Sequence, residues 1–260
     1  MATENTMDAR VITREEMHDI LHLHMLWLIN SDNGVQADFT DCIIENMDLD
    51  AVELRRAIFC RSSIKNVNFR RTNLMKADFR HAYISCVNFG SAILWRANFE
   101  DSRLINVSFK NAYLHEAQLA GVYLGDCALS GANLCSADLR SARGLPALVC
   151  PEKGSFIGFK KSGYDIKTSQ RYIIKLKIHK KAMRSSATSR KCRCSEAKVL
   201  SITTMDGKKG PSMVRSDHDK NFIYRVGRTV KVDDFDPDRW HECTSGIHFF
   251  ITREEAVAYS

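Results

Sequence analysis

Cysteine and histidine residues that could bind a metal occur in two stretches near the C-terminus of this 260-residue chain. Thiolate sulfur and imidazole nitrogen are the usual ligands of Zn²⁺ in proteins, and two loops could together supply the four that a tetrahedral site needs. The spacing matches none of the recognised zinc-finger patterns. We therefore expect no cofactor, and zinc is the alternative. The candidate ligands are Cys192, Cys194, His241, Cys243 and His248.

A thiol nucleophile is a second chemistry that the same region offers. Cys243 lies close in sequence to His241 and His248, and an imidazole can activate a cysteine by taking its proton. The sequence provides no third group to orient such a base, and it contains no glycine-rich phosphate loop. We therefore expect a non-enzymatic protein. The open alternative is a C-terminal module that binds zinc or is a small enzyme acting on a nucleotide.

Positive charge is concentrated in the same part of the chain. Thirteen Lys or Arg residues and a single acid, Asp165, lie between Lys153 and Arg193. The densest part mixes cations with hydroxyl and small side chains, which suits phosphate oxygens. We expect an anionic partner, such as a nucleic acid, a nucleotide or an acidic protein surface; a flexible basic loop without a ligand is the alternative. The predicted anion-binding residues are Lys175, Lys177, Lys180, Lys181, Arg184, Arg190, Lys191 and Arg193.

An α+β domain over residues 147–260 must position these groups. Ile174, Leu176 and Ile178 alternate with lysines, which is typical of a strand with one buried face. Thr252-Arg253-Glu254-Glu255 has the form of a capping box that opens a short final helix. The predicted strands are 155–159, 172–178, 199–203, 222–226 and 247–251.

The chain before this domain has a period of five. Every fifth residue from Phe39 to Leu139, twenty-one positions in all, is Phe, Leu or Ile, and a small or modest residue usually lies two positions earlier. Neither a helix nor a strand has this period. It fits a chain that turns a right angle every five residues, so that four steps close one coil of twenty residues.

These repeats resemble the pentapeptide-repeat family, whose motif is Ala-(Asp/Asn)-Leu-x-x. Ala37-Asp38-Phe39, Ala77-Asp78-Phe79 and Ala137-Asp138-Leu139 match it closely. The resemblance implies a mainly β fold, a right-handed quadrilateral β-helix of about five coils over residues 37–146. Members of the family share no single activity, and solenoids generally provide binding surfaces.

Residues 1–36 are predicted to cap the open end of the first coil. Thr13-Arg14-Glu15-Glu16 is a second capping box, and apolar residues follow it at helical spacing until Asn33-Gly34. We interpret His22 and His24 as surface or cap histidines with satisfied hydrogen bonds.

The outer surface of the repeats is electrically balanced, because residues 37–141 carry twelve acids and twelve bases. Quinolone-resistance relatives of the family are thought to mimic DNA and bind DNA gyrase, which requires rows of carboxylates. A gyrase or topoisomerase modulator is therefore an alternative that rests on fold analogy alone. We expect the charges to pair between coils, Asp41 with Arg61, Glu45 with Lys65, Asp50 with Arg70, Arg80 with Glu100 and Arg96 with Glu116.

One wall of the repeats carries large apolar side chains at outward positions. Such groups on a solvent-facing wall often mark a contact surface. Either a protein partner or the C-terminal domain of the same chain is expected to cover them. The predicted partner-binding residues are Met75, Ile93, Trp95, Tyr113 and His115.

The C-terminal domain looks like one that follows pentapeptide repeats in bacterial and phage proteins and has no established chemistry. The residues that carry this resemblance are 175–194, 222–227 and 243–250. Nine cysteines, an odd number, indicate reduced thiols, and the apolar stretch 21–29 is too short to span a bilayer. We predict a cytoplasmic binding protein that acts on a macromolecular or anionic target, with a role in conflict between phage and host.

Overall fold

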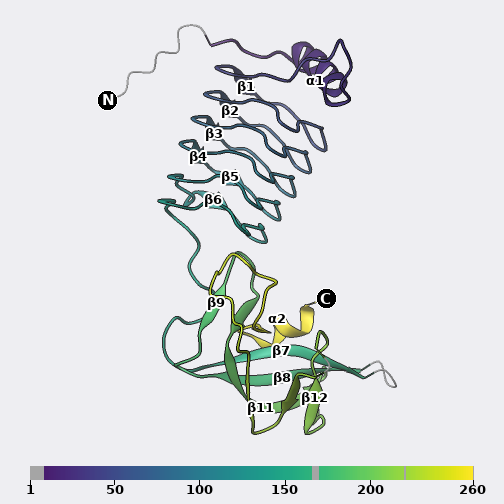
Figure 1. The fold of residues 1–260 in the computed structure, drawn as a ribbon, viewed down its shortest axis with the longest axis vertical. Helices are drawn as coiled ribbons and strands as arrows, with labels where there is room; N and C mark the ends of the chain where they lie inside the picture. The colour runs from purple at the N-terminus through teal and green to yellow at the C-terminus, as the bar shows by residue number, and fades with distance from the viewer. Residues whose placement is uncertain (1–8, 166–169, 220, 260) are drawn as a thin grey trace. The chain divides into compact units, whose positions relative to one another are not determined.

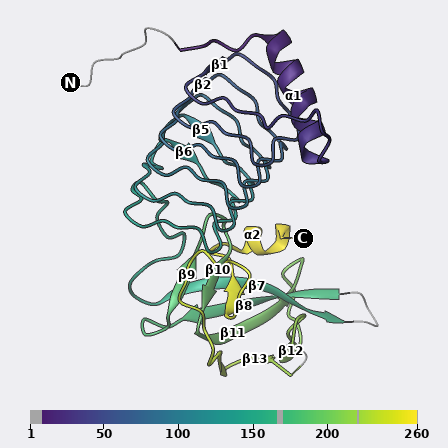
Figure 2. The same cartoon turned by 45° about the horizontal axis from the view of Figure 1, so that its top comes forward.

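The computed structural model describes residues 9–165, 170–219 and 221–259, and the chain divides into two compact units (Figure 1, Figure 2). Residues 1–146 form the N-terminal unit and residues 147–260 the C-terminal unit. In the part of the chain that is described, no helix combines the length and the apolar character needed to cross a membrane.

The N-terminal unit is a stack of coils joined by parallel β-pairing. Its main sheet has the order β1 (Ile43–Glu45), β2 (Ser63–Lys65), β3 (Tyr83–Ser85) and β4 (Arg103–Ile105), and β5 (Val107–Ser108) pairs with β6 (Cys127–Ala128). Ile44 lies opposite Ile64, and Ile64 opposite Ile84, so the register advances twenty residues per coil. This confirms the twenty-residue period expected from four five-residue steps.

Stacked phenylalanines fill much of the interior of the coils. Phe79 lies between Phe59 and Phe99, with ring centroids 4.7 Å away on each side and nearly parallel planes. A second stack contains Phe69 and Phe89, and Phe79 meets Phe89 edge-on at 5.7 Å and 78°. Both geometries are favourable for aromatic pairs. The repeated apolar position is therefore the core of this unit.

The polar residue of the repeat motif closes each turn of the chain. The carboxylate of Asp78 accepts a hydrogen bond from the backbone N–H of Arg80 at 3.0 Å, and the amide oxygen of Asn98 accepts one from Glu100 at 2.9 Å. Asp and Asn form such turns readily because their short side chains reach the backbone two residues ahead. The next residue, such as His81, then takes a left-handed conformation with φ of 59°.

Helix α1 (Arg14–Leu28) precedes the first coil and begins with the predicted capping box of Thr13 and Glu16. His24, fully buried, joins the helix to the coils. Its Nδ1 accepts the backbone N–H of Ala37 at 3.0 Å, and its Nε2 lies 3.1 Å from the main-chain oxygen of Arg55. This confirms that His24 is a satisfied cap histidine.

Ion pairs between coils are partly those expected. Arg61 binds Asp41 and Arg96 binds Glu116, each through a 2.6 Å contact. Glu45 lies directly opposite Lys65 in the register of β1 and β2. Two predictions are wrong, because Asp50 pairs with Arg71 and Arg80 pairs with Asp78 of its own turn. Asp50 thus binds the arginine one residue beyond the expected Arg70, and Arg80 binds a carboxylate of its own turn in place of Glu100.

The C-terminal unit contains two main sheets. One has the order β14 (Thr229–Lys231), β11 (Glu196–Thr204), β8 (Gln170–Ile178) and β7 (Phe156–Asp165), and the other the order β15 (Ile247–Phe249), β10 (Cys192–Cys194) and β9 (Arg184–Ser186). A hairpin of β12 (Met213–Arg215) and β13 (Ile223–Arg225), and helix α2 (Arg253–Ala258), complete the unit. All five predicted strands correspond to strands here, and the predicted capping box opens α2. Strands β9, β10, β12 and β14 were not predicted.

The two faces of the four-stranded sheet differ. Ile174, Leu176 and Ile178 of β8 are buried in the core, together with Val199 of β11. The alternate residues of β8, Lys175 and Lys177, are exposed. Since side chains alternate across a strand, the sheet has an inner, apolar face and an outer face that carries lysines.

Candidate functional site

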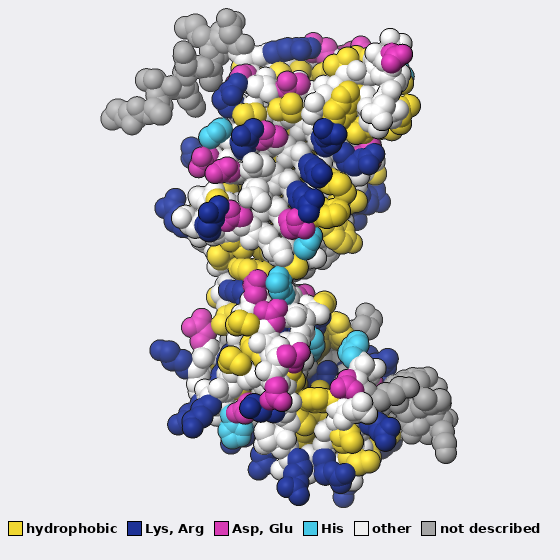
Figure 3. Space-filling model, in the orientation of Figure 1, with side chains coloured by type: hydrophobic (Ala, Val, Ile, Leu, Met, Phe, Trp, Pro, Cys, Tyr) yellow, Lys and Arg dark blue, Asp and Glu magenta, His cyan; other side chains and the backbone are white. Residues whose placement is uncertain are grey.

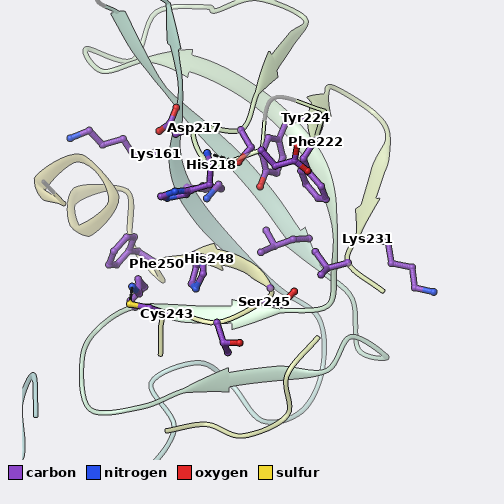
Figure 4. A pocket seen from close by; sticks show the side chains of 18 of the residues that line it. Lys161, Asp217, His218, Phe222, Tyr224, Lys231, Cys243, Ser245, His248 and Phe250 are labelled. Atoms are coloured by element: carbon purple, nitrogen blue, oxygen red, sulfur yellow. Dashed lines mark hydrogen bonds between the residues drawn. The ribbon is translucent and has the colours of Figure 1, made fainter. Parts of the chain in front are cut away.

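The described residues of the C-terminal unit enclose a cavity of about 1000 Å³ (Figure 4). Its lining comes from the adjoining strands β7 and β8, from the loop 216–219 and strand β13, from the end of β14, and from residues 243–248. The lining includes four aromatic side chains, and Phe222 and Tyr224 lie opposite Phe250 in the view of Figure 4. A partly apolar cavity with a few convergent polar groups is typical of a ligand site.

Lys160 of β7 reaches this cavity from the inner face of the sheet. It lies opposite Ile174 in the strand register, and its ammonium is 5.9 Å from the ring centre of Tyr224. Burial lowers the pKa of Lys160 to about 8; Asp217 counters this, and the charge of Lys191 adds to it. No described carboxylate forms an ion pair with Lys160. A half-buried cation without such a partner is unusual in a folded protein.

Lys191 is the second cation of the cavity. Its ammonium donates a hydrogen bond to the thiol of Cys243 at 3.2 Å and lies 5.8 Å from the ring centre of Tyr259. Burial opposes its charge, but the contact with Cys243 and the nearby Tyr259 and Glu242 outweigh burial and raise the pKa of Lys191. Lys191 therefore stays protonated at neutral pH.

His248 is on β15, close to both Lys160 and Lys191. Its Nε2 is 3.2 Å from the main-chain oxygen of Glu242, which fixes the proton on that nitrogen. Burial, followed by the positive charges of Lys191 and Lys160, lowers the pKa of His248 to about 4. The imidazole is therefore neutral at physiological pH, and both lysines lie near enough to act on it.

The predicted zinc ligands do not come together. Cys192 and Cys194 are fully buried and lie opposite Phe249 and Ile247 in the register of β10 and β15, whereas His248 lies opposite Arg193. The two thiols therefore occupy the opposite face of this sheet from the imidazole. Among the residues that the structure describes, no group of three or more His, Cys, Asp or Glu side chains is arranged to hold a metal. These five residues thus do not form the site proposed for them.

The two remaining zinc candidates, His241 and Cys243, each contact a different residue. Nδ1 of His241 is 2.9 Å from the carboxylate of Asp236, and the exposed thiol of Cys243 contacts Lys191. The structure thus gives Cys243 an ammonium as its hydrogen-bond donor, where the sequence suggested an imidazole.

Two of the predicted anion-binding arginines are structural. Arg193 is 2% exposed, and its guanidinium donates to the main-chain oxygens of Asp236, Asp238 and Ser245 at 2.7 to 3.0 Å. Arg184 donates to four main-chain oxygens, among them that of His179 at 2.7 Å. Their assignment to an anion-binding surface is therefore wrong, because backbone carbonyls already occupy their donors. The flexible-loop alternative is wrong for β9 and β10, which are paired strands.

The other predicted cations lie in three places. Lys175 and Lys177 are exposed on the outer face of the four-stranded sheet, and Lys180 and Lys181 are exposed just beyond the end of β8. Arg190 forms a 2.6 Å ion pair with Glu255. Lys191, as described above, lines the cavity. Figure 3 shows Lys and Arg side chains gathered along the lower edge of the C-terminal unit.

Sequence reasoning missed Lys198 and the distinct position of Lys160. Lys198 lies directly opposite Lys177 in the register of β11 and β8, a pairing that local sequence does not reveal. Lys160 belongs to the same basic run in the sequence. Its small neighbours two positions away on the strand, Gly158 and Ser162, are both buried, and this was the signal that Lys160 faces inward.

The apolar wall of the repeats is exposed in part. Ile93 and Tyr113 are bridge partners in adjacent coils, and Tyr113 is 55% exposed. Trp95 is 37% exposed, its ring lies 6.1 Å from that of His115, and Arg96 stacks on it at 5.1 Å. Met75 and His115 are half-buried. The five predicted residues therefore form outward columns of one wall.

Comparisons with known proteins agree with this architecture. Residues 53–85, 82–117 and 117–143 match the pentapeptide repeats, and residues 146–256 match a family of unknown function, DUF5758. None of the curated proteins matches the chain.

Several solved structures are similar to the repeats. HetL of the cyanobacterium Nostoc sp. strain PCC 7120, a protein involved in heterocyst differentiation regulation, is 20% identical with a TM-score of 0.23, over 42% of this chain and 60% of HetL. Rfr23 of Cyanothece 51142 is 20% identical with a TM-score of 0.26, over 49% of this chain and 94% of Rfr23. The fluoroquinolone resistance protein QnrB1 is 18% identical with a TM-score of 0.23, over 42% of this chain and 63% of QnrB1. The chain therefore spans less than two thirds of HetL, the first of these. It is a pentapeptide-repeat protein whose repeats are followed by a domain of the DUF5758 family.

Proposed function

We propose that this protein is a non-enzymatic scaffold that binds nucleic acid through the outer face of its C-terminal sheet and a protein through one wall of its repeats. Pentapeptide-repeat proteins are generally interaction or scaffold proteins. The repeat unit would be the right-handed quadrilateral β-helix of about five coils that the sequence predicts. The phosphate-binding part of the proposal rests on a set of lysines that we call the lysine face, Lys175, Lys177 and Lys198.

The observation that carries the proposal is the cross-strand pairing of Lys177 with Lys198. Like charges directly opposite each other destabilise a sheet, because their side chains lie only about 5 Å apart at Cβ. Lys175 lies two residues before Lys177 in β8, about 6.6 Å away on the same face. The salt bridges of the described residues include none of these three lysines. The positive charges of the three lysines therefore destabilise the folded sheet, and a bound polyanion would relieve their repulsion.

The chemistry of the lysine face favours the phosphate backbone over the bases. Ser201 lies opposite Lys175, and Thr229 lies opposite Lys198, so hydroxyls accompany the cations. Lysine ammonium and hydroxyl groups are common donors to phosphate oxygens, which carry no sequence information. We therefore infer binding that is independent of base sequence and sensitive to salt.

Fluorescence anisotropy with a labelled duplex of random sequence tests this proposal at about 50 mM salt, where phosphate contacts are strong. The variant with Lys175→Gln, Lys177→Gln and Lys198→Gln should bind at least about tenfold more weakly than the unmodified chain. A matched control carries Lys65→Gln, Lys76→Gln and Lys110→Gln, exposed residues of the repeat unit. It removes the same charge and should retain binding. Equal losses in both variants, or a preference for an acidic protein over DNA, would overturn the proposal.

The repeat wall with Trp95 and Tyr113 is the proposed protein contact. Large exposed aromatic side chains are enriched in the centres of protein interfaces, and here they stand in columns on a rigid stack of coils. A photoreactive amino acid at position 95 or 113 should crosslink one and the same protein in cells. The exposed position 101, on a different wall, is the control and should give no such product. Crosslinks of equal yield from all three positions would contradict a specific contact.

A further inference from the structure

We propose that the cavity of the C-terminal unit binds a nucleoside phosphate, with the phosphate between Lys160 and Lys191 and the base against the aromatic wall. This site is separate from the lysine face. Lys160 shares its row of the sheet with Ile174 and Ile202, which are buried, so it points to the inner side. None of the three residues of the lysine face lines the cavity.

Two cations that form no ion pair with a carboxylate of the described residues are the main evidence. Lys160 has the ring of Tyr224 as its described contact, and Lys191 has the thiol of Cys243 and the ring of Tyr259. The two ammonium groups also repel each other, since the charge of Lys191 disfavours the charged form of Lys160. Removing cations from water is costly unless an anion compensates them. A doubly charged phosphate would supply that compensation.

The acids that line the cavity are already engaged. Asp217 accepts the backbone N–H of Gly163 and binds Arg171, each at 2.9 Å. The carboxylate of Asp234 accepts the hydroxyl of Ser245 at 2.7 Å. Asp219 accepts the backbone N–H of Asn221, and Asp233 pairs with Lys231 at 3.7 Å. These contacts involve neither Lys160 nor Lys191, so Asp217 acts on Lys160 only through space and both ammonium groups can still bind a phosphate directly.

The size and walls of the cavity set the class of ligand. Its volume of about 1000 Å³ is at the upper end for small-molecule sites and exceeds what a free phosphate needs. Phe222 and Phe250 face the interior in Figure 4, and Tyr224 is buried beside Lys160. Aromatic rings stack well on nucleobases, with about 1–3 kcal/mol per base in single-strand binding proteins. Neutral His248 adds an imidazole without a further positive charge.

Calorimetric titration of the full chain with ATP, AMP, ribose 5-phosphate and inorganic phosphate tests the proposal. ATP and AMP should bind, and the two ligands without a base should bind at least about tenfold more weakly. Lys160→Met and Lys191→Met should each weaken ATP binding by at least about tenfold, which corresponds to 1.4 kcal/mol. The lysine-face triple variant is the control and should bind ATP normally while losing DNA. No binding of any nucleotide, or equal binding of ATP and inorganic phosphate, would overturn the inference.

Thermal unfolding separates a binding role of Lys160 from a structural one. Lys160→Met removes a desolvated cation that forms no ion pair with a described carboxylate, so Tm should rise although ATP binding is weakened. Lower stability together with unchanged ATP affinity would show a structural lysine and contradict the proposal. The affinity for ATP should also fall between pH 7 and about 9, because Lys160 loses its proton over this range. The groups that face Lys160 are Tyr224, Asp217, Lys191, Cys194 and His248. Lys160→Arg should flatten that pH profile, because arginine stays charged.

Discussion

The guanidinium of Arg193 donates a hydrogen bond of 2.9 Å to the main-chain oxygen of Ser245, and this contact ties β10 to the segment that lines the cavity. The same side chain holds the carbonyls of Asp236 and Asp238 and packs 5.3 Å from the ring centre of Phe235. Glycine suits position 246, because its φ of 149° is one that other residues rarely adopt and a Cβ there would lie 3.3 Å from Arg193. One buried arginine thus organises the loop that carries Cys243 toward the cavity.

Replacing Arg193 should therefore destabilise the C-terminal unit. Arg193→Met leaves three main-chain oxygens without their donor, and each unsatisfied buried group costs about 1–3 kcal/mol. We expect the free energy of unfolding from urea titration to fall by about 3 kcal/mol or more. Arg190→Met is the matched control, because the Arg190 side chain is 61% exposed in its ion pair with Glu255 and exposed pairs contribute about 0–1 kcal/mol. Equal effects of the two substitutions would contradict the structural role of Arg193.

A structural feature of this protein can be predicted from the sequence when its signal lies within one short segment of the chain. The five-residue period predicts the buried positions from Phe39 to Leu134, and the alternation of Ile174 and Leu176 reveals β8. Strand β10 was missed because its middle residue is a charged one, Arg193. The carbonyls that make its burial tolerable lie more than forty residues away in the chain.

The candidate site was predicted less completely for the same reason. The basic run was recognised as a whole, but its members divide among the outer sheet face, the cavity and the buried backbone contacts. Only the pairing of β7, β8 and β11 decides which lysine belongs where. A run of basic residues does not reveal which strands pair. The sequence alone therefore does not distinguish Lys160, on the inner face of the sheet, from Lys177, on the outer face.

His24 should stabilise the cap of the repeats through its two hydrogen bonds. His24→Leu leaves the N–H of Ala37 and the carbonyl of Arg55 unpaired, at a cost of about 2–3 kcal/mol in the unfolding free energy of the N-terminal unit. His22→Leu replaces an exposed histidine on the same helix and should be nearly neutral. A cost for His22→Leu as large as that for His24→Leu would contradict this account.

The same histidine gives the cap a pH dependence. Burial lowers the pKa of His24, so the unfolded chain binds a proton more readily than the folded one. Stability is therefore complete above the unfolded pKa of about 6.5 and falls as the pH decreases below it. The protection factors of the α1 amides, which correct exchange for its intrinsic pH dependence, should fall as the pH decreases over this range, and less so in His24→Leu. Protection factors that are independent of pH in the unmodified chain would contradict the prediction.

His248 should give the C-terminal unit a similar but wider pH dependence. Its pKa is about 4 in the folded state, against about 6.5 in an unfolded chain. Stability is therefore lost between pH 6.5 and 4, by up to about 3 kcal/mol at the lower end. Hydrogen exchange at β10 and β15 measures this loss, which His248→Gln should reduce. His218→Gln, an exposed control, should leave it unchanged, and a loss that persists in His248→Gln would contradict the assignment.

The salt dependence of DNA binding tests the central claim, that the lysine face neutralises phosphates, most directly. The logarithm of the binding constant should fall linearly with the logarithm of salt concentration, with a slope of about −0.9 for each phosphate neutralised. Loss of Lys175, Lys177 and Lys198 should make that slope shallower by about 3, roughly one for each lysine. The control variant with Lys65, Lys76 and Lys110 replaced should keep the original slope. An unchanged slope in the lysine-face variant, or no DNA binding at low salt, would contradict the account.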